Sequence, residues 1–229
     1  MVIRSKGLEI RWEKLPDDFV LPDDPVDNIA QPALAAALTD ALATAGRLPA
    51  KTLTTTTYGI CATVNDKVVV KAPDWAYIPR LVMPRDEIHR SYTPQLQGEL
   101  PLIVMEFLSD EDGREYSIKP TYPPGKWFFY ERVLQVPDYA LFDLDSSNLE
   151  FYRLGDNKRY KIVEPDAAHR NWIPEMDLAL GLWSGQHENR DGVWLRWWDA
   201  EGNLLRWGLE RAEKLADRLR SLGIDPDVV

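Results

Sequence analysis

The chain has 229 residues, of which 45% are hydrophobic and 28% charged, and its formal net charge is −10 at pH 7. This length and apolar content suffice for one large domain, or for a core with appendages. The acidic balance argues against non-specific coating of nucleic acid and against an anionic membrane surface, because both attract basic proteins. A local basic patch can still bind nucleic acid within an acidic whole.

The cysteine content and the hydropathy indicate the compartment. Cys61 is the only cysteine, so no disulfide can form within the chain, which is typical of a reducing cytoplasm. The first fifteen residues lack the apolar core of a signal peptide, and no stretch approaches about 18 uninterrupted apolar residues. We therefore expect a cytoplasmic protein without a membrane span.

The first third of the chain predicts an arm, a helix and several strands. Residues 1–31 contain an acidic, proline-bearing passage, and we interpret them as an extended arm lying over the core. Residues 32–46 are rich in alanine, carry leucine at every fourth position and end in Gly46, which predicts a helix packed on a sheet. Strands are then expected over 52–64, 67–71 and 75–82, with the Thr run on an exposed sheet face.

Two short features in this region matter for function. Asn65-Asp66 is typical of a hairpin turn. Asp74 follows Pro73, which cannot donate to a strand ladder, so we place Asp74 at a strand edge or bulge. Residues 83–100 are rich in proline and polar side chains and are expected to form a loop.

The apolar run 101–109 (Pro-Leu-Ile-Val-Met-Glu-Phe-Leu-Ser) predicts a strand buried on both faces. Glu106 lies within it, and a buried carboxylate needs a partner such as a metal ion or a lysine. The alternative is a Glu at the solvent-facing end of the strand, and the run alone does not decide between the two.

The stretch that follows predicts an irregular loop and then a helix. Residues 109–125 are dense in acids and prolines and contain Lys119, and a loop of this length is often functional. Lys126 and Tyr130 stand four residues apart, which places them on one face of a helix. The alternative is an ordinary amphipathic helix in which Trp127 packs inward and Lys126 only lies along the surface.

The last part of the chain predicts a meander, a hairpin and a helix. Strands over 138–145, 149–154 and 160–164 are separated by turn residues. The tryptophans of 194–198 precede the turn Ala-Glu-Gly-Asn and a second apolar piece at 204–207, which together indicate a hairpin. We expect these tryptophans to serve packing or an interface, although exposed ones can stack bases. The final helix, 209–222, carries an apolar stripe that either packs on its own core or pairs with a second copy.

An Asp and a Glu on neighbouring strands with a Lys close by form a recognisable chemical constellation. Two carboxylates bind a divalent cation through hard oxygen ligands, and the cation polarises a phosphoryl oxygen and acidifies a bound water. The lysine positions that water or stabilises the developing negative charge. Asp74, Glu106 and Lys126 therefore indicate metal-assisted phosphodiester hydrolysis, with Lys119 as the second candidate for the lysine.

Several segments together resemble the Uma-type restriction endonuclease family. They are Lys-Ala-Pro-Asp-Trp at 71–75, Val-Met-Glu-Phe-Leu-Ser at 104–109, Gly-Lys-Trp-Phe-Phe-Tyr at 125–130 and the strand at 136–145. The resemblance covers about residues 50–165, and the Trp-rich helical tail is similar to that of a long subgroup. It implies a bacterial protein with a PD-(D/E)XK nuclease core.

By this resemblance Asp74 matches the first metal-binding acid and Glu106 the second, with Mg²⁺ or Mn²⁺ as the cofactor. The family's usual lysine two residues after the second acid is absent, because Leu108 stands there. The Lys-x-x-x-Tyr helix motif matches Lys126 and Tyr130, which implies a catalytic lysine on the helix and an orienting tyrosine.

We therefore expect an α/β fold with a restriction-endonuclease-like core, a mixed β-sheet flanked by helices. In this interpretation residues 1–31 form the arm, 32–165 the core, and 166–229 a Trp-rich hairpin and C-terminal helix without independent stability. The expected function is metal-dependent endonuclease cleavage of nucleic acid, DNA before RNA, by a homodimer. The alternative is a catalytically silent nuclease fold that acts as a dimeric binding or regulatory module.

Overall fold

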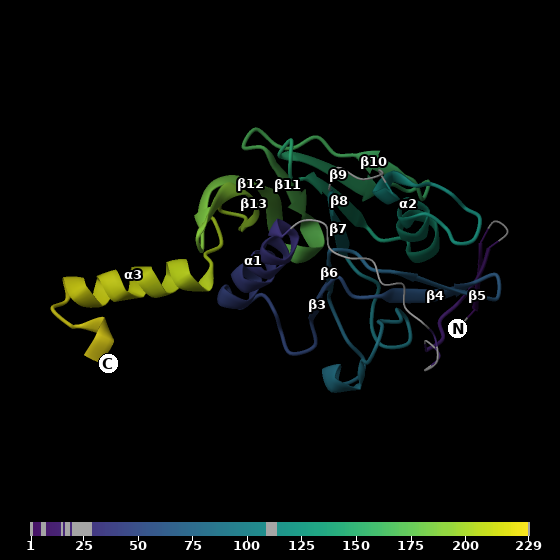
Figure 1. Ribbon diagram of the computed structural model, residues 1–229, viewed down its shortest axis with the longest axis horizontal. Coiled ribbons are helices and arrows are strands. Elements are labelled where there is room, and N and C mark those ends of the chain that lie inside the picture. Colours follow the sequence, from purple (N-terminus) through teal and green to yellow (C-terminus); the bar gives the residue numbers. More distant parts are fainter. Residues whose placement is uncertain are drawn as a thin grey trace.

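A computed structural model describes residues 2–5, 8–14, 16, 19, 29–108 and 114–228. The chain has a mixed α/β architecture with a central mixed sheet, two smaller sheets and a helix at the C-terminal end (Figure 1). This arrangement is that of a restriction-endonuclease-like fold, as the sequence predicted. No helix in the described ranges is long and apolar enough to cross a membrane.

The central sheet has six strands in the order β10-β9-β8-β7-β6-β3. Its strands are β3 (Leu53–Thr56), β6 (Trp75–Ile78), β7 (Ile103–Leu108), β8 (Asp138–Asp143), β9 (Asn148–Leu154) and β10 (Tyr160–Ile162). Strands β7 and β8 are parallel, and the other neighbours are antiparallel. The predicted buried strand around Glu106 and the predicted meander 138–164 are both confirmed.

Helix α1 (Ala30–Thr44) covers one face of this sheet. Its leucines at 34, 38 and 42 are buried against side chains of β6, β7 and β8, as their spacing predicted. The helix ends where Gly46 adopts a φ of 70°, a left-handed conformation that glycine adopts without strain.

The other face of the central sheet is covered by the helical segment 126–134 and by a four-stranded sheet. The order of this sheet is β1-β2-β4-β5, formed by β1 (Val2–Ser5), β2 (Leu8–Arg11), β4 (Ile60–Val64) and β5 (Lys67–Lys71). Asn65 and Asp66 both have positive φ in the β4–β5 turn, which is the hairpin turn that the sequence predicted. The N-terminal arm thus begins as a hairpin that pairs with β4, and most of its acidic passage between Leu15 and Asn28 lies outside the described residues.

The prediction of one strand over 52–64 is wrong. The chain breaks at Thr57, whose φ is 46°, and β3 and β4 then join different sheets. The Thr run also does not form an exposed face, because Thr55 points into the interior with 6% exposure. Successive side chains of β3 point to opposite faces of the sheet, so Thr55 is buried while the neighbouring Thr56 is exposed.

The connection from β7 to β8 contains the helix that carries Lys126. A short α2 (Lys126–Phe128) continues without interruption into η3 (Phe129–Leu134), which is a π-helix, and ends where Gln135 adopts a left-handed conformation. A helix was expected here, but not its wider turn, which often occurs at functional sites. Two parallel neighbouring strands require a crossover of this kind.

The C-terminal region forms a third sheet that packs on α1. It contains β11 (Arg170–Ile173), β12 (Leu178–His187) and β13 (Arg190–Trp198) in that order. The predicted hairpin of 194–198 with 204–207 is wrong, because β13 pairs with β12 over its whole length and Leu204 makes a single bridge to Trp198. The tryptophans at 194, 197, 198 and 207 are buried, which confirms their packing role.

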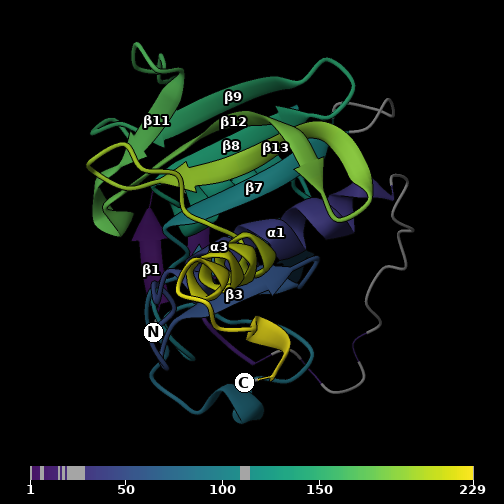
Figure 2. The ribbon, with the colours of Figure 1, turned by 90° about the vertical axis from the view of Figure 1, so that its left-hand side faces the viewer.

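Helix α3 (Gly208–Ser221) projects away from the rest of the molecule (Figures 1 and 2). None of its residues is buried, and Leu209, Leu215 and Leu222 are between 57% and 60% exposed. The apolar stripe therefore does not pack on the protein's own core.

Candidate functional site

The site is built on the face of the central sheet that α2 and η3 cover. Side chains alternate along β7, so that Met105 and Phe107 pack toward α1 while Glu106 points to the opposite face, toward α2 and η3. Glu106 is fully buried, which excludes the solvent-facing alternative. Both of its oxygens are hydrogen-bonded, because Lys126 Nζ donates to Oε2 and the Tyr130 hydroxyl donates to Oε1, each at 2.9 Å.

Asp74 lies beside Glu106 on the neighbouring strand. The antiparallel register pairs Trp75 with Met105, so the next position along sets Asp74 across from Glu106. The backbone N–H of Phe107 donates to Asp74 Oδ2 at 2.6 Å, which fixes the aspartate at this edge. The structure thus brings together Asp74, Glu106, Lys126 and Tyr130 from three separate elements.

Burial dominates the electrostatics of the two carboxyl groups. Removal from water raises the pKa of Glu106 to about 8, against the opposing effect of the Lys126 ammonium. Burial also raises the pKa of Asp74, although the Phe107 N–H and Lys126 lower it. The pKa of Lys126 is raised, because the surrounding carboxylates outweigh its own burial, and Lys126 is therefore the site's fixed positive charge.

Lys126, and not Lys119, is the lysine that contacts Glu106. Lys119 is an exposed residue of the segment before the helix, and its carbonyl accepts a hydrogen bond from the Gly125 N–H. Lys126 is held by the first turn of α2, one helical turn before Tyr130, so both side chains reach the same carboxylate.

Sequence reasoning missed two further residues at this site. Glu115 Oε1 lies 3.4 Å from Lys126 Nζ, and the Tyr139 hydroxyl donates to the Glu115 carbonyl at 3.0 Å. Gln31, in the first turn of α1, donates from Nε2 to the Phe107 carbonyl at 2.7 Å. Glu115 could be seen only as one acid in an acidic stretch, and nothing in the sequence connected Gln31 with a strand 76 positions away.

The donor set fits a hard divalent cation. Asp74 and Glu106 offer carboxylate oxygens with acceptor capacity beyond the hydrogen bonds they make. Within the described ranges no three His, Cys, Asp or Glu side chains are grouped to hold a metal ion. A magnesium-type ion needs no such cage, because it is bound through one or two carboxylates and completes its octahedron with water and substrate phosphate.

The comparisons with known proteins identify the family. The model of the Uma2 family, described as "Putative restriction endonuclease", matches residues 9–188. This range includes all four clustered residues and ends in the turn between β12 and β13, so that β13 and α3 lie beyond it. No curated protein matches the chain. Because the match covers most of the sequence, the chain belongs to the Uma2 family, whose description is "Putative restriction endonuclease".

Proposed function

We propose that the protein is a metal-dependent endonuclease that hydrolyses phosphodiester bonds of nucleic acid, with DNA favoured over RNA. Its metal ligands are Asp74 and Glu106, and its cofactor is Mg²⁺ or Mn²⁺. The observation that carries the proposal is the 2.9 Å contact of Lys126 with Glu106, directly across from Asp74. Membership of a nuclease-type family supports the same reaction.

Each side chain has a distinct task in this reaction. A bound divalent ion would supply Lewis-acid polarisation of the phosphate and a water of lowered pKa. Lys126 keeps its positive charge next to the two acids and stabilises the negative charge that develops on the phosphoryl oxygens. Tyr130 holds Glu106 by its hydroxyl and so orients the carboxylate toward Asp74.

The proposal is tested by incubating end-labelled DNA, and RNA of the same sequence, with the purified protein and millimolar Mg²⁺ or Mn²⁺. Cleavage should occur with either metal and stop in EDTA. Asp74→Asn and Glu106→Gln should abolish it, because each replaces a charged ligand by a neutral amide of the same shape. If none of the proteins cleaves DNA or RNA, the catalytically silent binding or regulatory module is the better description.

We further propose that the protein forms a homodimer through α3. The support is the exposed apolar stripe on a helix whose N-terminal end is held firmly by α1 and β13. Asp40 accepts the Gly208 N–H at 2.7 Å, and Arg196 binds Glu210 at 2.8 Å.

We also propose a cytoplasmic location. Cys61 is the only cysteine and is a free, buried thiol, which suits a reducing compartment.

A further inference from the structure

The segment 114–125 exposes large apolar side chains next to the candidate site. Three such side chains lie within one stretch of seven residues: Tyr116, Ile118 and Tyr122 are 39%, 70% and 51% exposed. Glu115 and Lys126 flank these residues in sequence and contact each other. Single exposed apolar residues are common on protein surfaces, but a group beside a candidate active site indicates a contact surface.

This segment is held in a defined position by backbone contacts. The Phe128 N–H donates to the Ser117 carbonyl at 3.3 Å, and the Gly125 N–H donates to the Lys119 carbonyl at 2.9 Å. The approach is so close that a Cβ added at Gly125 would lie 2.0 Å from the Ser117 carbonyl oxygen, so only glycine fits there. The exposed aromatic rings are therefore presented by an ordered part of the fold.

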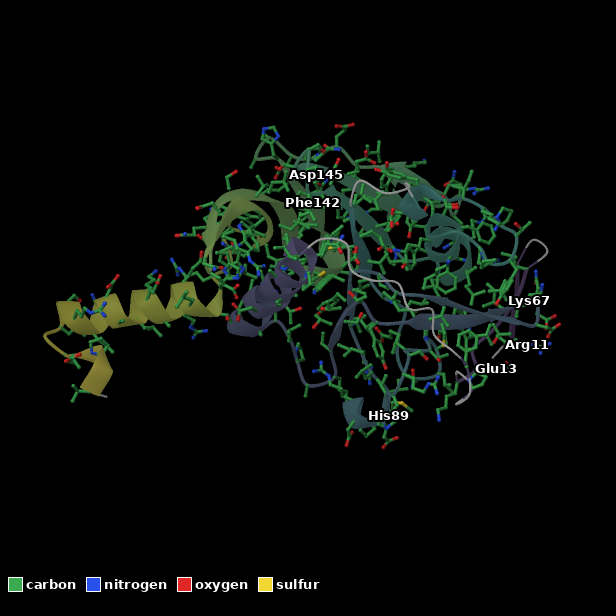
Figure 3. All side chains as sticks on the ribbon, viewed as in Figure 1. Arg11, Glu13, Lys67, His89, Phe142 and Asp145 are labelled. Atoms are coloured by element: carbon green, nitrogen blue, oxygen red, sulfur yellow. The ribbon has the colours of Figure 1, made fainter. Side chains whose placement is uncertain are left out.

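Each exposed tyrosine has a defined setting. The Tyr116 ring stacks on Trp127 with 6.3 Å between centroids and 22° between planes, and Trp127 directly follows Lys126. The Lys67 ammonium lies 4.9 Å from the centroid of the Tyr122 ring, whose hydroxyl donates to the Val68 carbonyl. Figure 3 shows Lys67 at the outer end of the β4–β5 hairpin.

Charge differs between the two ends of the segment. Around Tyr116, partial burial and then Glu150 raise the pKa of the phenol to about 12, with Asp143 acting in the same direction. A phosphate is disfavoured next to these carboxylates, whereas an uncharged base is not. The Tyr122 end carries the exposed Lys67.

We propose that Tyr116 and Tyr122 stack unpaired nucleobases of the substrate, so that the site prefers single-stranded nucleic acid to duplex. The inference rests on the proposed nuclease function and adds a substrate class to it. Aromatic side chains bind single strands because each unpaired base offers a face for stacking, and in a duplex those faces are already occupied. The strand's phosphates would pass on the Lys67 side, away from the carboxylates around Tyr116.

The test measures binding without cleavage, by fluorescence anisotropy in EDTA. The probes are a labelled 20-nucleotide single-stranded DNA, the RNA of the same sequence, and the matched DNA duplex. The proteins are the wild type, Tyr116→Ala with Tyr122→Ala, and Tyr116→Phe with Tyr122→Phe. Trp172→Ala is the matched control, because Trp172 is as exposed as Tyr116 but lies on β11, away from the segment. Thermal melting checks that every variant is folded.

The wild type should bind the single strands more tightly than the duplex. The double Ala variant should lose at least about 30-fold of single-strand affinity, because it removes two stacking rings, whereas the Phe variant and Trp172→Ala stay within about twofold. Whichever of the DNA and RNA probes binds more tightly shows whether the site prefers deoxyribose or ribose. Equal binding of single strand and duplex, or an unchanged affinity in the folded Ala variant, would overturn this inference and leave metal-dependent cleavage as a separate question. Absence of binding to all probes would also overturn this inference, whereas the proposed function is judged separately, by cleavage in Mg²⁺ or Mn²⁺.

Discussion

At the scale of single residues, the site is a pair of neighbouring acids with one ammonium. Two full charges about 4 Å apart repel by about 4 kcal/mol at an effective dielectric near 20, so both acids are not readily ionised without a cation. Lys126 supplies part of that compensation, and burial raises the pKa of both acids. Further positive charge would therefore be needed to keep both acids ionised at neutral pH.

A divalent metal should consequently stabilise the folded protein. Binding at 100 times the dissociation constant adds about 2.7 kcal/mol to the free energy of unfolding, which for a chain of this size raises Tm by roughly 5–10 °C. The measurement is a thermal melt of the wild type with and without millimolar Mn²⁺ or Mg²⁺. Asp74→Asn combined with Glu106→Gln should remove the shift, and an equal shift in that variant would show that the metal binds elsewhere.

Glu106 should also give the stability a defined pH dependence in EDTA. Its pKa is about 8 in the folded protein and near 4.5 when exposed, so the folded state binds its proton more tightly. The stabilisation it contributes is complete below about pH 4.5 and is lost as the pH rises to 8, because the folded state then has to ionise a buried group. Urea unfolding at pH 5 and at pH 8 should show this decline in the wild type.

In Glu106→Gln the same decline should be smaller, because the amide does not titrate. Asp138, whose pKa burial raises to about 6, is common to both proteins and cancels in the comparison. A decline of the same size in both proteins would mean that Glu106 is ionised throughout this range.

The sequence predicted the identities of these residues better than their geometry. Asp74, Glu106 and Lys126 were named from residue type and spacing, whereas the orienting role of Tyr130 was implied by the family resemblance. Their contacts depend on the register between β6 and β7 and on the course of the crossover, and neither is encoded locally. Gln31 and Glu115 were missed for the same reason, since only tertiary packing brings them to the site.

At the scale of elements, α3 shows how a projecting helix is anchored. Arg196 is fully buried, its guanidinium lies 3.3 Å from the centroid of the Trp207 ring, and it binds both oxygens of Glu210. Glu210 also accepts the Trp207 N–H at 2.8 Å, which closes the first turn of the helix. One buried arginine therefore joins β13 to the start of α3.

Arg196→Met should lower the free energy of unfolding by about 2 kcal/mol, because it leaves the buried Leu205 carbonyl and the partly exposed Glu210 carboxylate without their donor. Chemical denaturation measures this change. Arg220→Met is the matched control, since Arg220 pairs with Asp217 on the exposed part of the same helix and should cost less than about 1 kcal/mol. Similar losses for both variants would contradict the anchoring role of Arg196.

The elements with strong local signals were predictable, and those that depend on partner choice were not. The Ala-rich helix, the turn at Asn65-Asp66 and the buried strand around Glu106 each follow from local composition. The hairpin at 194–207 was predicted from its turn residues, but β12 offers β13 nine paired positions, against one bridge from Leu204. The strand over 52–64 failed because two short strands of similar composition belong to different sheets.

At the scale of the whole molecule, α3 makes self-association testable. Ala212, Leu215, Leu219 and Leu222 follow a 3-4-3 spacing that places them on one face of the helix. Light scattering at micromolar concentration should give the mass of a dimer, and Leu215→Glu with Leu219→Glu should reduce it to that of a monomer with an unchanged circular dichroism spectrum. A wild-type monomer would contradict the proposal, and a dimer that survives both changes must use another surface.

The central claim is that Lys126 serves a metal-dependent nuclease site, and one comparison tests it most directly. Single-turnover cleavage of labelled DNA in Mn²⁺ is measured for the wild type, Lys126→Met and Lys119→Met. Lys126→Met should slow cleavage by at least about 100-fold, because it removes the ammonium beside Glu106, whereas Lys119→Met should stay within about twofold. Unchanged cleavage in Lys126→Met, or loss of cleavage in Lys119→Met alone, would contradict the account.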